Sequence, residues 1–162
     1  MRVPFRGKVV GVPKLRANRR RCPGTQEEIA TLNRLAEHVS SLGWNVIFSK
    51  EEEDGITPAL RNITINSGNS FKSQTFALLH EAGHIAVFSR PDYIERYPDG
   101  YVRYAGKTTT RSNRHKFDVL REEISAWDEA ENLAVSLDLN INMRDMRDER
   151  NRSLITYVEW FK

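Results

Sequence analysis

The chain has 162 residues, of which 39% are hydrophobic and 29% are charged. This length suits a single domain, and the composition is typical of a folded globular protein rather than a disordered one. No apolar run approaches the ~20 residues of a membrane-spanning helix, and the first residues lack the apolar stretch of a secretory signal. Cys22 is the only cysteine, which excludes an internal disulfide and predicts a reducing, cytoplasmic location without membrane contact.

Charge is distributed unevenly along the chain. Of its 25 lysines and arginines, eight lie in residues 1–24, whereas all 22 acidic side chains lie further along. We therefore expect a basic N-terminal arm (residues 1–24) followed by one domain over residues 25–162. Positive charge on residues 2–21 could attract nucleic acid or an acidic protein surface. The alternative is a solvated arm that aids solubility.

Residues 25–65 carry the first regular elements. Thr25 and Glu28 have the spacing of a capping box, and apolar residues at helical spacing follow, which predicts a helix over 26–42 that ends at Gly43. Residues 44–48 and 63–65 are rich in β-branched and aromatic side chains and predict strands, separated by an acidic turn at 51–55.

Residues 71–88 predict a second helix with an unusual composition. Its side chains are apolar nearly all the way round, which is typical of a helix buried on most sides. The exceptions are His80, Glu81 and His84.

The second half of the chain contains fewer clear elements. Residues 89–117 predict a loop-rich region with a short strand over 101–104, as residues 8–12 do within the arm. A third helix is predicted over about 118–137. The charged tail ends in residues 154–161, which predict a docking helix or strand.

The segment His80-Glu81-Ala82-Gly83-His84 has the spacing of a zinc site. Histidines four residues apart lie one turn apart on one face of a helix, where both can bind one Zn²⁺ ion. Glu81 then projects towards a water that the metal activates, so it is the candidate general base. Gly83 lets a neighbouring strand or the substrate pass close to the helix. The alternative is a hydrogen-bonded cluster that binds no metal.

A catalytic zinc site also needs a third protein ligand. A third histidine on the same segment is excluded, because Val87 and Arg90 stand where that pattern needs glycine and histidine. The remaining sources are His115, Asp118 and the carboxylates of the third helix.

At about 100° per residue, Glu123 falls at the centre of the apolar arc of the third helix. Glu122 and Glu129 fall at its solvent edge. A carboxylate aimed into the core needs a charged partner, which favours Glu123 as the ligand. The alternative is an ion pair between Glu123 and an arginine.

Residues 73–84 and 123–130 together resemble the ImmA/IrrE type of zinc metallopeptidase. In that family one helix carries a His-Glu-x-Gly-His-like sequence, and a later helix supplies a glutamate followed by alanines three and seven residues on. Glu123, Ala126 and Ala130 match this pattern. The resemblance covers roughly residues 60–137 and implies a gluzincin-like site with His80, His84 and Glu123 as ligands.

The fold expected from this resemblance is α+β and zincin-like. A small, mostly antiparallel sheet would pack on the central helix that bears the motif and on a second helix that bears the third ligand. The chain departs from the family at Leu137-Asp138-Leu139-Asn140, where a Leu-Met-Pro-like segment is common, and it shows no helix-turn-helix module.

The function predicted from these residues is zinc-dependent hydrolysis of a peptide bond in a protein or peptide substrate. Tyr101, Tyr104 and His115 are candidates for binding the substrate or the oxyanion, although each could simply pack in its loop. The alternative function is a metal-containing binding or regulatory module that engages nucleic acid or an acidic partner through its basic arm.

Overall fold

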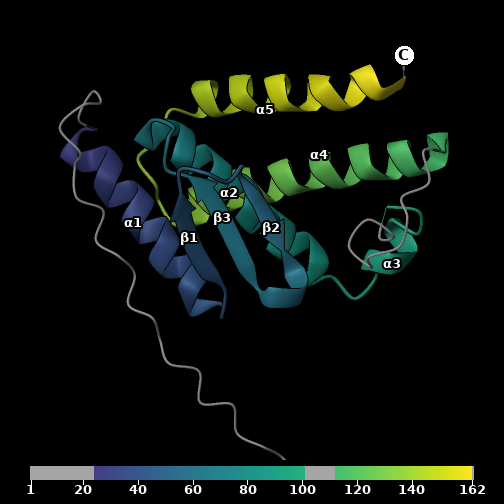
Figure 1. The fold of residues 1–162 in the computed structure, drawn as a ribbon, viewed down its shortest axis with the longest axis horizontal. Coiled ribbons are helices and arrows are strands. Elements are labelled where there is room, and N and C mark those ends of the chain that lie inside the picture. Colours follow the sequence, from purple (N-terminus) through teal and green to yellow (C-terminus); the bar gives the residue numbers. More distant parts are fainter. Residues whose placement is uncertain (1–23, 101–111, 162) are drawn as a thin grey trace, which may run out of the picture.

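The computed structural model describes residues 24–100 and 112–161. These residues form an α+β fold that is mostly helical, with one small sheet (Figure 1). In chain order the elements are α1 (Gln26–Ser41), β1 (Asn45–Ser49), β2 (Gly55–Thr57), a 3-10 turn (Pro58–Leu60), β3 (Asn62–Asn66), α2 (Phe71–Phe88), α3 (Tyr93–Arg96), α4 (Asn113–Ser136), α5 (Met143–Val158) and a second 3-10 turn (Glu159–Phe161). The strands predicted at 8–12 and 101–104 lie outside the described residues.

The sheet is mixed, with strand order β1-β3-β2. Strand β1 runs parallel to β3, from Asn45 opposite Asn62 onwards, whereas β2 is antiparallel to β3. The expectation of a mostly antiparallel sheet is therefore wrong. After β1 the chain runs back through β2 and the 3-10 turn to the end of the sheet at which β1 begins. Strand β3 therefore starts beside the beginning of β1. Arg61, with a φ of 51°, provides the final reversal.

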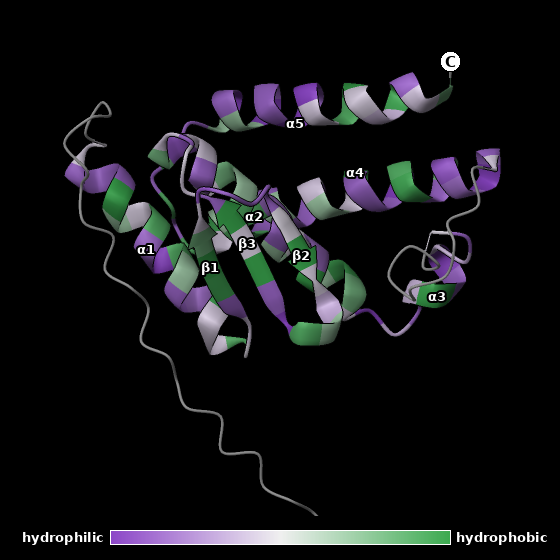
Figure 2. Ribbon diagram, in the orientation of Figure 1, coloured by the Kyte–Doolittle hydropathy of each residue, from purple (hydrophilic) through white to green (hydrophobic). Residues whose placement is uncertain are grey.

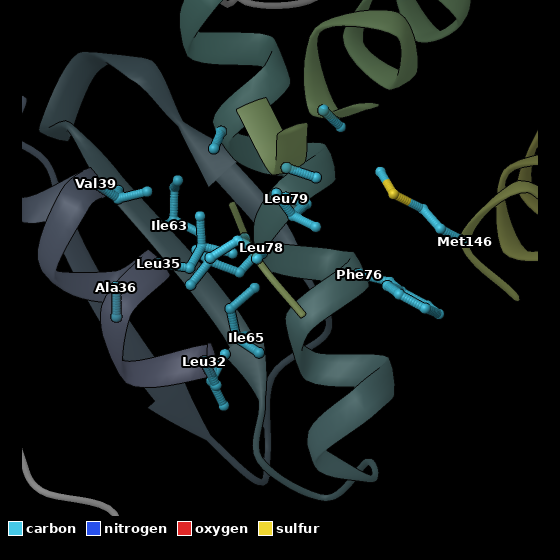
Figure 3. Close-up of a cluster of buried hydrophobic side chains, with 14 of the residues drawn as sticks. Leu32, Leu35, Ala36, Val39, Ile63, Ile65, Phe76, Leu78, Leu79 and Met146 are labelled. Atoms are coloured by element: carbon cyan, nitrogen blue, oxygen red, sulfur yellow. The ribbon is translucent and has the colours of Figure 1, made fainter. Parts of the chain in front are cut away.

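The predicted start and end of the first helix are confirmed by the structure. Thr25 caps α1 through a capping box with Glu28, whose carboxylate accepts from the Thr25 backbone N–H at 2.8 Å. Gly43 has a φ of 82°, the left-handed conformation that ends a helix at low cost. Buried side chains of α1, β3 and α2 then meet in one core, where Leu35, Ile63 and Leu78 are in contact (Figure 3).

Helix α5 is the element that the sequence pattern anticipated least. Met146 is its only buried residue, and most of its surface is hydrophilic (Figure 2). Ion pairs connect it to its neighbours instead: Arg150 lies 2.8 Å from Asp128 and 3.3 Å from Glu131, both on α4. At its first turn, Asp145 pairs with Lys72 of α2 at 2.7 Å. Within 24–100 and 112–161, no helix combines the length and apolar character needed to cross a membrane.

Helices α2 and α4 approach so closely that their backbones touch at Gly83. A β-carbon at Gly83 would stand 2.0 Å from the carbonyl oxygen of Ala126, far inside van der Waals contact. Gly83 therefore makes room for a neighbouring helix, whereas the sequence led us to expect a strand or a substrate there. Ala126 is fully buried at this crossing, so small side chains on both helices set their separation.

We predict that Gly83→Ala destabilises the protein. Helix propensity alone would favour alanine over glycine by about 1 kcal/mol. The added methyl group instead meets backbone, which cannot rotate away as a side chain can, and overpacking of this kind costs about 1–3 kcal/mol or more. Urea denaturation followed by circular dichroism should therefore show a lower free energy of unfolding.

The matched control is Gly55→Ala, because a β-carbon at Gly55 would meet nothing within 4 Å. This variant should stay within about 1 kcal/mol of the wild type. Equal stability of Gly83→Ala and the wild type would contradict the close helix approach.

Candidate metal centre

The two histidines of the motif stand on α2, one turn apart, as the sequence predicts. Ser70 caps this helix by accepting from the Ser73 backbone N–H, so the helix begins well before the motif. The rings of His80 and His84 lie edge to face with centroids 4.7 Å apart. His84 is 2% exposed, whereas His80 is partly open to solvent.

Glu123 reaches both histidines from α4. Its Oε2 atom lies 3.1 Å from Nε2 of His80 and 3.5 Å from Nε2 of His84. Each of the three residues offers a ligand atom within 4.8 Å of the others, and within 24–100 and 112–161 this is the one such group of three. The crossing at Gly83 and Ala126 explains the proximity, because Gly83 lies between the two histidines and Ala126 lies one turn after Glu123.

The donor set and its spacing fit a divalent cation. Two ligand atoms bound to tetrahedral Zn²⁺ at ~2.0–2.1 Å stand ~3.3–3.4 Å apart. The two distances from Glu123 to the histidines lie on either side of that value. Imidazole nitrogen and carboxylate oxygen are both ligands that zinc accepts. His80, His84 and Glu123 could therefore hold a metal ion.

Electrostatics within the group already favour a positive charge at its centre. Burial raises the pKa of Glu123, but His80 and His84 outweigh it and hold that pKa well below its ordinary range. Burial lowers the pKa of His84, but contacts with Glu122 and Glu123 outweigh it and raise that pKa to about 10. Without a metal, a proton on His84 thus supplies positive charge beside the two carboxylates.

Glu81 is buried next to the ligands and lines a hollow on the surface. The hollow has a volume of about 330 Å³ and is bounded by residues of α2, α4, α5 and the turns before β2 and α2: Asp54, Asn69, Ser73, Ala77, His80, Glu81, Trp127, Glu149 and Ser153. Burial raises the pKa of Glu81, and the neighbouring histidines lower it in part. His80 and Glu81 are therefore the members of the motif that a molecule in this hollow would reach.

Glu122 corrects the sequence analysis. We expected it at the solvent edge of α4 together with Glu129, but it is 0% exposed. Its Oε1 atom lies 3.3 Å from Nδ1 of His84, and its Oε2 atom accepts a hydrogen bond from the Tyr93 hydroxyl at 3.2 Å. Glu129 does remain partly exposed, where it pairs with Arg90.

Trp127 also belongs to the site, although the sequence pattern predicted only that it lies on the apolar side of the third helix. Its ring stacks on His80, with centroids 4.6 Å apart and planes 27° from parallel. The position follows from helical spacing, since Trp127 lies one turn after Glu123 on the same face of α4.

The other candidates from the sequence lie away from the three ligands or cannot be placed. His115 is in the first turn of α4, where its Nδ1 atom lies 2.8 Å from the carbonyl oxygen of Asp99. Asp118 accepts from the Asp99 backbone N–H at 3.0 Å. Since α4 rises about 1.5 Å per residue, His115 stands about 12 Å along the axis from Glu123. Tyr101 and Tyr104 fall outside the described residues, so a role in binding substrate stays a prediction for them and for His115.

Comparison with known proteins does not add a family. No protein-family description matches the chain, and neither the curated proteins nor the solved structures include a significant match. The geometry of the site therefore carries the functional argument.

We predict that Glu123→Ala sharply lowers zinc affinity. Two histidines would remain from the three protein ligands, and α2 and α4 would lose the metal that connects them. Titration of the metal-free protein with Zn²⁺ against a competing chelator should show weaker binding. Zinc should also raise the midpoint of thermal unfolding less than it does in the wild type.

Glu129→Ala is the control on the same helix, because this carboxylate pairs with Arg90 rather than with the histidines. Its zinc affinity should match that of the wild type. If Glu123→Ala bound zinc as tightly as the wild type, Glu123 would not be the third ligand.

Proposed function

We propose that the protein is a zinc-dependent peptidase in which Glu81 is the general base. The observation that carries this proposal is the placement of Glu81. It is buried directly beside a group of three residues that could hold a metal, and it lines the same hollow as His80. The resemblance of residues 73–84 and 123–130 to ImmA/IrrE-type metallopeptidases supports the same reaction.

The residues of the chain divide the work of hydrolysis between them. His80, His84 and Glu123 would hold the ion, which when bound polarises a carbonyl group and lowers the pKa of a water. Glu81 takes a proton from the attacking water at its carboxylate and later gives it to the leaving amine. For the first transfer the Glu81 carboxylate must be ionised. Burial raises its pKa, and positive charge at the histidines lowers that pKa in part.

The surroundings of the group favour an enzyme over a purely structural metal site. Structural zinc sites are closed by four protein ligands, whereas catalytic sites have three and one open position. Within the described part of the chain the group has three members. The hollow of about 330 Å³ gives a substrate a way to reach it.

A peptide substrate would enter between α2 and α5. Asp54 bounds the hollow before β2, whereas Glu149 and Ser153 bound it on α5. Trp127 forms its apolar floor beside His80. A polypeptide in this hollow would meet these polar groups together with His80 and Glu81 of the motif.

We expect Glu81→Gln to retain zinc and to abolish hydrolysis. The amide preserves the shape of the side chain but cannot accept a proton, and loss of a general base typically lowers the rate by about 10²–10⁴-fold. Cleavage of unstructured protein substrates such as casein, followed by mass spectrometry, measures the loss. Zinc content of the same preparation should equal that of the wild type.

Turnover of this variant at the wild-type rate would sink the mechanism. Glu52→Gln is a suitable control, because Glu52 is an exposed carboxylate in the turn between β1 and β2. It should leave both zinc content and hydrolysis unchanged.

A second function is proposed for the basic N-terminal arm. Its eight basic side chains with no acidic one suit binding of nucleic acid or of an acidic protein surface. Such a contact would place a substrate or a regulated complex next to the peptidase domain.

If the arm binds nucleic acid, affinity should fall steeply as salt rises, because each neutralised phosphate releases a counterion. Fluorescence anisotropy with a labelled DNA duplex and with a labelled single-stranded RNA tests this at low and at physiological salt. Deletion of residues 2–21 should remove binding and leave zinc affinity unchanged. A lack of binding by the full chain at low salt would leave only the role in solubility.

A further inference from the structure

The side chain of Glu122 is the most deeply buried carboxylate beside the motif. It is 0% exposed, yet it is neither one of the three candidate ligands nor the base. One of its oxygens lies 3.3 Å from Nδ1 of His84, and the other accepts from the hydroxyl of Tyr93 on α3. A carboxylate in such a place is costly unless each oxygen has a partner.

The arrangement assigns the two nitrogens of His84 to different tasks. Nε2 lies towards Glu123 at 3.5 Å, whereas Nδ1 lies towards Glu122 at 3.3 Å. A nitrogen that binds a metal must present its lone pair, so the proton of the neutral ring must be on Nδ1. The carboxylate of Glu122, 3.3 Å from Nδ1, favours a proton on that nitrogen and therefore the tautomer whose Nε2 can bind a metal.

His80 lacks an equivalent carboxylate among the described residues. Its Nδ1 atom is buried and, unlike Nδ1 of His84, has no carboxylate at ion-pair distance in that part of the chain, although neither Nδ1 atom meets full hydrogen-bond geometry. Both rings stack on an aromatic side chain, His80 on Trp127 and His84 on Phe88. His84 differs in having a carboxylate beside its Nδ1 atom as well.

We propose that Glu122 is a positioning residue that orients His84 for metal binding, with Tyr93 holding Glu122 in turn. This inference rests on the proposed metal centre. Through Tyr93 it extends the site to α3, so that three helices take part in aligning one ligand. A carboxylate behind a metal-bound histidine also makes the imidazole a better donor, and removing such a partner typically costs about 10–100-fold in metal affinity.

The test compares Glu122→Gln with Glu129→Gln. Both change one α4 carboxylate to its amide, but Glu129 pairs with Arg90 and contacts neither histidine. Competition with a chelator should show zinc affinity reduced about 10–100-fold in Glu122→Gln and unchanged in Glu129→Gln. Tyr93→Phe, which removes only the hydroxyl, should give a smaller loss in the same direction.

A spectroscopic measurement separates positioning from a merely structural role. Cobalt(II) in place of zinc absorbs visible light with bands that depend on ligand geometry and donor strength, so Glu122→Gln and Tyr93→Phe should shift these bands. A structural role would lower the unfolding midpoint of the metal-free protein but leave the cobalt spectrum and zinc affinity as in the wild type. An unchanged cobalt spectrum and unchanged zinc affinity would overturn the proposal. If Glu122→Gln fails to fold, the same result for Tyr93→Phe alone would overturn it.

These measurements do not depend on hydrolysis. If the wild type binds zinc and Glu122→Gln binds it equally well, the positioning role is wrong and the peptidase proposal stands. If the wild type binds zinc but cleaves nothing, the peptidase proposal fails and the positioning role stands. If the wild type binds no zinc, both are wrong.

Discussion

The contact between Gly83 and Ala126 determines the geometry of the whole candidate site. At this point the α2 and α4 backbones are so close that a β-carbon at Gly83 would stand 2.0 Å from a carbonyl oxygen. Gly83 lies between His80 and His84, and Ala126 lies one turn after Glu123. A larger residue at either position would move Glu123 away from the histidines, and ligand bonds of ~2.0–2.2 Å allow very little such movement.

This close approach concentrates ionisable groups where the protein is otherwise apolar. Four ionisable side chains are buried here: Glu81, His84, Glu122 and Glu123. An unpaired charge in such surroundings costs roughly several kcal/mol. The groups offset that cost for one another: the raised pKa of His84 and the lowered pKa of Glu123 describe an imidazolium held beside carboxylates. A divalent cation would take over the role of that proton. Metal binding would then replace the proton on His84 by a cation, among side chains that the fold has already brought together.

The cleft side of the site is built differently from its core. Helix α5 buries only Met146, and ion pairs of Arg147, Arg150 and Asp145 add to its connection with α4 and α2. Partly exposed ion pairs of this kind contribute little to stability. The side of the hollow that bears Glu149 and Ser153 therefore depends less on apolar packing than the α2–α4 core does.

The periodicity of apolar residues predicted the buried face of a helix correctly where a single neighbouring helix covers that face. The bounds of α2 follow from its apolar composition, and the inward position of Glu123 follows from the arc of α4, because α2 packs against that arc. Glu122 was misplaced because a second layer covers the next face of α4. Tyr93 of α3 donates to it, and a β-carbon at Gly100 would stand 3.6 Å from its Oε2 atom. Nothing in the spacing of α4 itself indicates that cover.

The remaining differences also arise from tertiary contacts. Strand β2 has three residues, too few to show an alternating pattern, and it forms because Ile56 pairs beside Ile63. Helix α5 is mostly charged, and the few apolar side chains that it packs against the core, among them Met143, Met146 and Leu154, are too sparse for periodicity to detect. By contrast, the capping box at Thr25 and the left-handed Gly43 depend only on adjacent residues, and both were predictable.

The central claim is that His80, His84 and Glu123 together bind one metal ion. Crystals of the zinc-loaded protein measured on both sides of the zinc absorption edge test this claim most directly. We predict one anomalous peak at ~2.0–2.2 Å from Nε2 of both histidines and from the Glu123 carboxylate, with a further position open towards the hollow. A peak bound by other residues, or none between α2 and α4 in protein that contains zinc, would contradict it.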